Sequence, residues 1–259
     1  MLRRELLAVM AAGVLVPGAG STAAAGQVAS VEGGSLVLAD GRKLWLLGVL
    51  MPQAGATPEQ GEPGAAEVDA ALAADAVGRA VELSAFMGPD RGGRFGAIVT
   101  LSGDQGSLNE RLIRGGWGRV YLLPGLAKAD DPGATLLPGL LRAEAAARAE
   151  GRGLWHYPAY RPRQAGAEDL WSARDRFHLV EGRVRRVMKR AGFGAELTLG
   201  EGRNALRVVI ASPVGRALKA QGTDPHDLDD AKLRVRGWLT LGGGLTVTLE
   251  RPEYLEKLP

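Results

Sequence analysis

Hydrophobic residues in the stretch 28–53 fall into three short runs separated by two turn signals. Gly33-Gly34 separates the first run from the second, and Asp40-Gly41 separates the second from the third. Asp and Gly tolerate the positive φ angles of tight hairpin turns, so each signal between strand-like runs predicts a reversal of the chain. The stretch therefore predicts a three-stranded meander that ends at Pro52, because proline cannot donate to a ladder.

Helical and strand-like patterns alternate from here to residue 155. Apolar positions at helical spacing predict an amphipathic helix over 65–81. Ser107, followed by Glu110 three residues later, predicts a capped helix start, and a glycine pair ends that helix. The other expected elements are strands at 82–86, 95–101 and 118–122, a loop over 124–133 and a helix over 136–150.

A second set of strands follows a proline-containing stretch, 157–175, which we interpret as a linker. Strands are expected at 178–188, 195–199 and 205–211, then a helix with Ser212 as N-cap and Pro213 at its first position, then strands at 232–241 and 244–250. This order is the layout of an OB barrel. We therefore expect an α+β protein with two domains, a five-stranded barrel with three helices over 26–156 and an OB-like β-barrel over 176–259.

The first 25 residues read as a signal peptide. Arg3 and Arg4 precede an apolar run of about 11 residues, 6–16, and Ala23-Ala24-Ala25 offers small residues for cleavage. The run is too short for a membrane span, which needs about 20 residues. We expect a periplasmic or secreted protein with no membrane span in the mature chain; a buried N-terminal helix is the alternative interpretation.

Composition narrows the chemistry only in part. The chain has 259 residues, a net charge of +3 and no cysteine, so disulfides, thiol nucleophiles and cysteine metal sites are excluded. Three histidines stand in unrelated segments without ligand spacing. Neither a glycine-rich phosphate loop nor a Ser-His-Asp arrangement is present.

Three spaced motifs in residues 28–155 together resemble the staphylococcal-nuclease-like (thermonuclease) family. They are the meander, the segment from Asp90 and Arg94 through 108–121, and the helix 141–148 with its Gly-Leu-Trp at 153–155. The resemblance implies a calcium ion held by carboxylate and carbonyl oxygens, a glutamate that acts on the attacking water, and two arginines that neutralise the phosphate. The stretch from Phe177 onward looks like the OB-type extension of some exported members.

The residues at the family's functional positions depart from that pattern. The resemblance sets the two metal aspartates at Gly34 and Leu50, the base at Gln53 and the first arginine at Trp45; Arg94 alone is kept. Glycine and leucine offer no side-chain oxygen, and glutamine cannot take a proton at neutral pH. We therefore expect no metal site, no cofactor and no catalysis. An active calcium-dependent endonuclease or phosphodiesterase, with Glu32, Glu59, Glu62 or Glu67 as replacement groups, is the alternative. Arg94 is either a relic phosphate contact or a structural partner of Asp90 or Glu110.

A binding role rests on the densest basic run and on one aromatic residue. The run lies on and just after the first strand of the second barrel and comprises Arg183, Arg185, Arg186, Lys189 and Arg190. Barrels of this type often bind single-stranded nucleic acid, and Tyr121 is a candidate for base stacking. The alternatives are an ordinary half-exposed strand, core packing for Tyr121, and a protein that contacts other envelope proteins.

Overall fold

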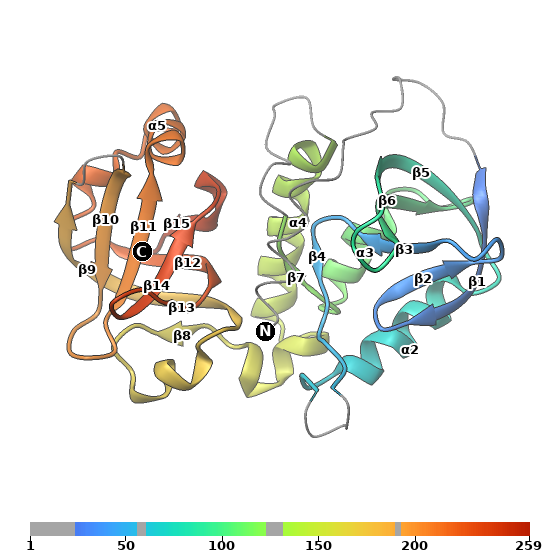
Figure 1. Ribbon diagram of the computed structural model, residues 1–259, viewed down its shortest axis with the longest axis horizontal. Coiled ribbons are helices and arrows are strands. Elements are labelled where there is room, and N and C mark those ends of the chain that lie inside the picture. The colour runs from blue at the N-terminus through green and yellow to red at the C-terminus, as the bar shows by residue number, and fades with distance from the viewer. Residues whose placement is uncertain (1–23, 56–60, 123–131, 190–192) are drawn as a thin grey trace. The chain divides into compact units, whose positions relative to one another are not determined.

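The computed structural model describes residues 24–55, 61–122, 132–189 and 193–259 (Figure 1). These residues divide into two compact units, with the boundary between Ala159 and Tyr160. Residues 1–23 of the expected signal peptide and most of the expected loop 124–133 lie outside the described residues, whereas Ala24 and Ala25, the last two residues of the expected cleavage segment, begin the first strand. In the described part no helix is long and apolar enough to cross a membrane.

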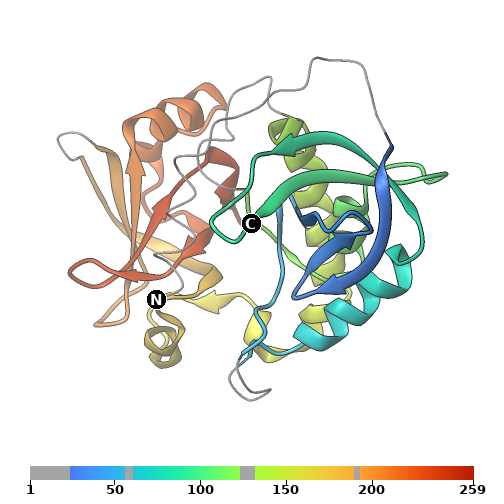
Figure 2. The same ribbon diagram turned by 45° about the vertical axis from the view of Figure 1, so that its right-hand side comes forward.

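The first unit contains a closed barrel of five strands in the order β1-β2-β3-β6-β5 (Figure 2). Its members are β1 (Ala24–Glu32), β2 (Ser35–Leu38), β3 (Lys43–Leu46), β5 (Ala80–Met87) and β6 (Arg94–Leu101). The predicted meander is confirmed, because β1 pairs antiparallel with β2 and β2 with β3. The parallel pairing of β3 with β6 and the antiparallel pairing of β1 with β5 close the barrel.

Three helices accompany the described part of this barrel: α2 (Ala65–Ala76), α3 (Leu108–Arg114) and α4 (Pro132–Ala149). The helix predicted over 65–81 is shorter than expected because Gly78 adopts φ +81°, and β5 begins two residues later. A separate two-stranded ladder joins β4 (Val49–Leu50) to β7 (Arg119–Val120), so the residues just before Pro52 pair with the strand after α3.

Two buried polar side chains tie the core of the first unit together. The Asn109 amide donates to the carbonyls of Leu47 and Ala97, at 2.8 and 3.0 Å, and its oxygen accepts from the N–H of Val99. Glu144, fully buried on α4, accepts from the N–H of Val120 at 2.7 Å. Each side chain satisfies backbone groups that strand pairing leaves open, which fixes the helices against the barrel.

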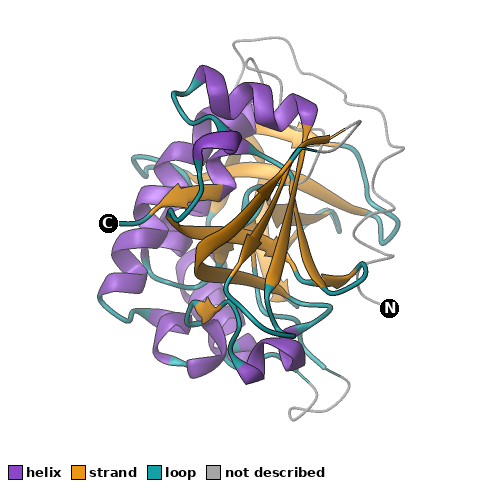
Figure 3. Cartoon of the chain, turned by 90° about the vertical axis from the view of Figure 1, so that its left-hand side faces the viewer, coloured by secondary structure: helices purple, strands orange, loops and turns teal. Residues whose placement is uncertain are grey.

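The second unit has the expected strand and helix order in one strongly twisted sheet (Figure 3). Its central strands are β9 (Phe177–Met188), β10 (Phe193–Leu199), β11 (Leu206–Ala211), β12 (Lys232–Trp238) and β14 (Leu245–Leu249), with α5 (Ser212–Ala220) between β11 and β12. Only Leu239 separates β12 from β13 (Thr240–Leu241), which pairs with β14. The series of paired strands therefore returns to its start, as in an OB barrel, and β15 (Leu255–Lys257) pairs with the other end of β12.

Two details of the second unit refine the sequence-based expectation. The stretch 157–175, interpreted from the sequence as a linker, contains short 3-10 helices at Pro158–Tyr160 and Glu168–Ala173, and β8 (Arg163–Gln164) pairs with β9. Ser212 is the first residue of α5 rather than its N-cap. Ala211 takes the cap position and makes no side-chain hydrogen bond there.

Candidate functional site

The turn between β1 and β2 holds Gly34, the first of the expected metal positions. Gly33 and Gly34 have φ angles of +54° and +76°, and their N–H groups donate to the two oxygens of Asp69 at 3.1 and 2.7 Å. A Cβ on Gly34 would lie 2.8 Å from Sδ of Met51, whose side chain is buried. Backbone and thioether therefore occupy the space in which a side-chain carboxylate would have to stand.

The second metal position, Leu50, lies in the β4–β7 ladder directly opposite Arg119. The Arg119 side chain is only 5% exposed and contacts Glu62 at 3.3 Å. Glu62 also accepts from the N–H of Gln53 at 2.9 Å, and its own N–H donates to the Gln53 carbonyl at 2.8 Å. A buried cation and its carboxylate partner thus stand beside Leu50 and Gln53, the positions at which the resemblance sets a metal ligand and the base.

Trp45, at which the resemblance sets the family's first arginine, packs onto the neighbouring strand. In the parallel ladder it lies beside Gly96, and a Cβ on that glycine would meet the indole ring at 2.6 Å. The absence of a side chain at Gly96 therefore makes room for the ring. Trp45 is half-buried and packs on β6.

Arg94, at which the resemblance sets the family's second arginine, pairs with Asp90. Its Nε donates to Asp90 Oδ2 at 3.0 Å, and the Arg94 and Asp90 backbones bond to one another across the turn. The Asp90 side chain is 10% exposed and the Arg94 side chain 46% exposed. This geometry matches the structural interpretation of Arg94 with Asp90. The other proposed partner, Glu110, pairs with Arg114 instead.

The carboxylates considered as replacement groups have partners of their own. Glu32 pairs with Lys43 at 2.7 Å, and Glu67 accepts from the hydroxyl of Tyr157 at 2.8 Å. That hydrogen bond lowers the pKa of Glu67, which makes its carboxylate a weaker base. Glu59 lies outside the described residues. Among those described, no group of three or more His, Cys, Asp or Glu side chains could hold a metal ion.

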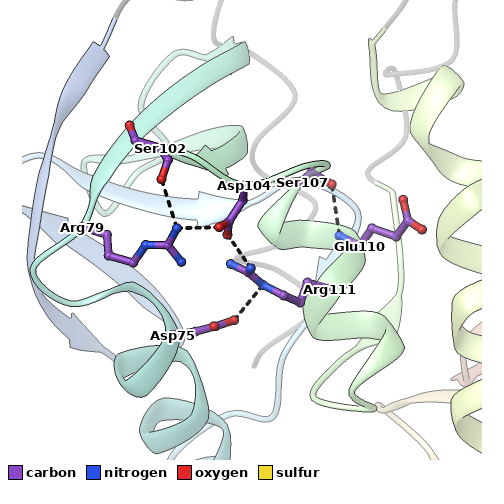
Figure 4. Close-up of polar contacts among 7 residues, drawn as sticks. All are labelled: Asp75, Arg79, Ser102, Asp104, Ser107, Glu110 and Arg111. Carbon is purple, nitrogen blue, oxygen red and sulfur yellow. Dashed lines mark hydrogen bonds and ion pairs between the residues drawn. The ribbon is translucent and has the colours of Figure 1, made fainter.

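Residues around α3 form a polar network that has a structural explanation (Figure 4). The Ser107 hydroxyl accepts from the N–H of Glu110 at 3.2 Å, which confirms the predicted cap. Asp104 accepts from Arg79 at 2.6 Å and pairs with Arg111. The Arg79 hydrogen bond first, and the Arg111 hydrogen bond second, lower the pKa of Asp104. Arg111 also pairs with Asp75 at 2.8 Å, so the network joins α2 to α3.

Tyr121, the candidate stacking residue of the first unit, lies in the core. Its side chain is 7% exposed, and its N–H donates to the carbonyl of Gly48 at 3.1 Å. This burial corresponds to the packing interpretation and leaves little of the ring for a base. Trp117 is half-buried and lies within 2.8 Å of where a Cβ on Gly115 would stand.

The basic run of the second unit is exposed along β9, but its members differ in their partners. Arg183 contacts Asp230 at 3.0 Å, and Arg185 contacts Glu201 at 3.0 Å. Arg186 and Lys189 are also exposed. Arg190, the fifth predicted member, lies outside the described residues. The run therefore forms one cationic strand face, part of whose charge is balanced by acids from two loops.

Three contributors to the first-unit site were missed from the sequence: Met51, Asp69 and Arg119. Met51 and Asp69 read as core and helix residues, and Arg119 as part of a short strand. Of the three, only Asp69 carried a usable signal in the sequence, because its spacing places it on one face of a predicted helix. In the structure that residue lies opposite the Gly33-Gly34 turn. Their roles depend on contacts between segments tens of residues apart, for which the local pattern contains no information.

A five-stranded OB barrel with helices after its third strand and after its last strand defines a known class of domain. Residues 43–157 match the family described as staphylococcal nuclease homologue. The match ends within the first unit, so the second unit is not included in it. No curated protein matches the chain.

Proposed function

We propose that this is an exported, catalytically degenerate member of the nuclease family that acts as a nucleic-acid-binding module. One observation carries the loss of catalysis: the positions for metal ligands and base are occupied by Gly34, Leu50 and Gln53, and neighbouring side chains fill the space around them. Met51 packs on the glycine, and the Glu62–Arg119 pair stands beside the other two.

Calcium does not fit the residues present at this site. A hard cation needs several oxygen ligands at 2.3–2.6 Å, roughly the length of a direct coordination bond. The turn at Gly34 presents N–H groups already satisfied by Asp69, and the ladder partner of Leu50 is an arginine, whose charge repels a cation. No catalytic step is therefore assigned to a metal in this protein.

Binding without catalysis is supported by the cationic face of β9. Phosphate groups of nucleic acids are held mainly by Arg and Lys, and OB-type sheets commonly carry such contacts. Export is supported by the sequence of the first 25 residues. Fractionation of cells and N-terminal sequencing of the mature protein test it, with a start near Gly26 expected. A cytoplasmic, uncleaved chain would contradict this part of the proposal.

Calorimetric titration of the purified mature protein with calcium tests the degenerate site. We expect no saturable heat. A nuclease assay with single-stranded DNA, calcium and an EDTA control provides the second measurement. Cleavage that EDTA abolishes, and that Arg94→Ala removes while the nearby exposed Arg91→Ala does not, would overturn the proposal and establish the active phosphodiesterase.

Retention on single-stranded DNA at low salt separates binding from the remaining alternative. Salt-sensitive retention supports a nucleic-acid-binding module. Absence of retention at low salt would refute nucleic acid as the ligand. Contacts with other envelope proteins would then remain as the function.

A further inference from the structure

Four exposed cations lie along β9 and just after its end, and we call this row the track: Arg183, Arg185, Arg186 and Lys189. Between Val184 and Arg186, β9 advances by two residues while β10 advances by one, from Leu199 to Thr198. Such a bulge interrupts the alternation of sides. Arg185 and Arg186 are consequently both exposed, whereas Val184 is buried. The strand therefore presents more cations to solvent than a regular strand of the same sequence would.

Two members of the track are held by acids of the same unit. The Arg183 guanidinium donates to the backbone carbonyl of Asp230 at 2.8 Å and to its carboxylate at 3.0 Å. Arg185 contacts Asp230 at 3.7 Å and Glu201 at 3.0 Å. Both arginines thus already contact carboxylate oxygens, the same kind of acceptor that a phosphate offers.

Asp230 is held in its position by the backbone around it. It has φ +58°, a left-handed conformation uncommon outside glycine. Its N–H donates to the Val184 carbonyl at 3.1 Å, and the N–H of Val184 donates to the carbonyl of Ala231 at 2.8 Å. These bonds attach the loop to β9 directly beside the two arginines. The backbone therefore holds the Asp230 carboxylate beside Arg183 and Arg185.

The other members of the track are without such partners. The side chains of Arg186 and Lys189 are exposed and make no ion pair or hydrogen bond with the described residues. On the adjacent strand, exposed Lys232 lies directly opposite Arg183 and adds a further cation. Free cations therefore flank the pair that Asp230 and Glu201 balance.

We infer that the backbone of a single-stranded nucleic acid binds along β9, with Arg186 and Lys189 as its direct phosphate contacts. In the same inference, Asp230 and Glu201 compete with phosphate for Arg183 and Arg185 and so limit affinity. It rests on the proposed function and assigns the ligand's phosphates to particular side chains. Phe177, at the start of β9, is buried, and phosphate contacts carry no sequence information, so we expect the contact to be independent of base sequence.

The competition is favourable to test because the acid–arginine pairs are exposed. The Asp230 and Glu201 side chains are 70% and 73% exposed, and Arg183 and Arg185 nearly half exposed. Exposed ion pairs contribute little to stability, so neutralising the acids frees the arginines without unfolding the domain. Asparagine also tolerates the left-handed conformation, which makes Asp230→Asn a mild change to the backbone.

Fluorescence anisotropy with labelled 12-nucleotide single-stranded DNA, as oligothymidine and as a mixed sequence, measures the affinity of the full mature chain over a salt series. Each phosphate contact on a single strand contributes about 0.7 to the slope of log K against log salt. Arg186→Gln with Lys189→Gln should lower that slope by about 1.4 and weaken binding about 25-fold at 0.1 M salt. Both oligonucleotides should bind alike.

The matched control is Arg183→Gln with Arg185→Gln, which removes the same charge from the same strand. Because those arginines are already balanced, affinity should fall only about twofold to threefold. Asp230→Asn with Glu201→Gln should strengthen binding about fivefold or more. Circular dichroism and thermal melting of every variant verify the fold.

The outcomes separate this inference from the proposed function. Failure of the unmodified protein to bind either oligonucleotide at low salt refutes the proposed function. The unmodified protein could bind while the Arg186→Gln, Lys189→Gln variant and the Arg183→Gln, Arg185→Gln variant lose the same affinity. That result refutes the assignment of the phosphate contacts and leaves the proposed function standing. Unchanged affinity after neutralising Asp230 and Glu201 refutes the competition.

Discussion

Gly34→Asp restores the carboxylate expected of the family and should destabilise the first unit. Three terms add. The residue has φ +76°, and an L side chain there costs about 1 kcal/mol. Its Cβ would lie 2.8 Å from Met51 Sδ and 3.3 Å from Met51 Cβ, so a buried side chain must move, at about 1–2 kcal/mol. The new carboxylate also stands near Asp69, which adds about 0.5–1 kcal/mol of like-charge repulsion.

The expected total loss is about 2.5–4 kcal/mol, and the same turn provides the control. Gly33 has φ +54° and no atom within 4 Å of an added Cβ, so Gly33→Asp carries the backbone term without the Met51 contact. Because the N–H of Gly33 also donates to Asp69, the new carboxylate carries the same like-charge term, and we expect this variant to cost about 1.5–2 kcal/mol. Urea unfolding, followed by tryptophan fluorescence with Trp171 and Trp238 replaced by Phe, reports on the first unit.

A double-mutant cycle isolates the Met51 contact. Met51→Ala alone costs about 2–3 kcal/mol because it leaves a cavity in the core. Combined with Gly34→Asp it removes the clash, so the pair should be less destabilised than the sum by about 1–2 kcal/mol. Equal stability of the Gly33→Asp and Gly34→Asp proteins, together with an additive cycle, would refute the packing argument.

Three further perturbations test the scaffold by urea unfolding. Asn109→Ala removes the side-chain partner of three buried backbone groups, of which the Ala97 carbonyl keeps the N–H of Leu47, and should cost about 3 kcal/mol; a loss below about 1 kcal/mol would show that water replaces the amide. Gly96→Ala should cost about 2 kcal/mol because of the ring of Trp45, and Trp45→Ala in the same chain should recover part of it; additivity would exclude the contact. The Arg79 hydrogen bond lowers the pKa of Asp104 below 3.8, so this carboxyl stabilises the fold above that pH and the contribution is lost as pH falls through the lowered folded pKa. Asp104→Asn should therefore flatten the dependence of stability on pH below about 4, and an unchanged acid limb would contradict the network.

The parts of the fold that could be predicted from the sequence are those decided by neighbouring residues. Gly33-Gly34 and Asp40-Gly41 determine turns through their own φ preferences, and Ser107 caps its helix three residues away. The same local rules failed where a boundary depends on one residue, as at Gly78, which ends α2 before 81. They also failed at Ser212, whose side chain is not used by the helix it begins.

Contacts between distant segments account for what could not be predicted of the site. Glu62 and Arg119 are 57 positions apart, and Arg183 and Asp230 are 47 apart. The charges were visible in the sequence, but their pairing depends on how the strands are arranged. The basic run consequently looked uniform in the sequence, whereas the structure divides it into balanced and unbalanced members.

The positions set by the family resemblance are linked to their neighbours by size and charge, which supports the proposal that packing and ion pairing have taken the place of a catalytic site. Gly34 accommodates Met51, and Gly96 accommodates Trp45. Active sites hold polar groups that are poorly satisfied without ligand, and replacing them with packed neighbours gains stability at the expense of activity. Each contact made in this way raises the cost of restoring a single catalytic residue, because the neighbour must move as well. On the proposed function, ligand binding depends on a different surface, and the exposed cations of β9 provide one in the unit that the family match does not include.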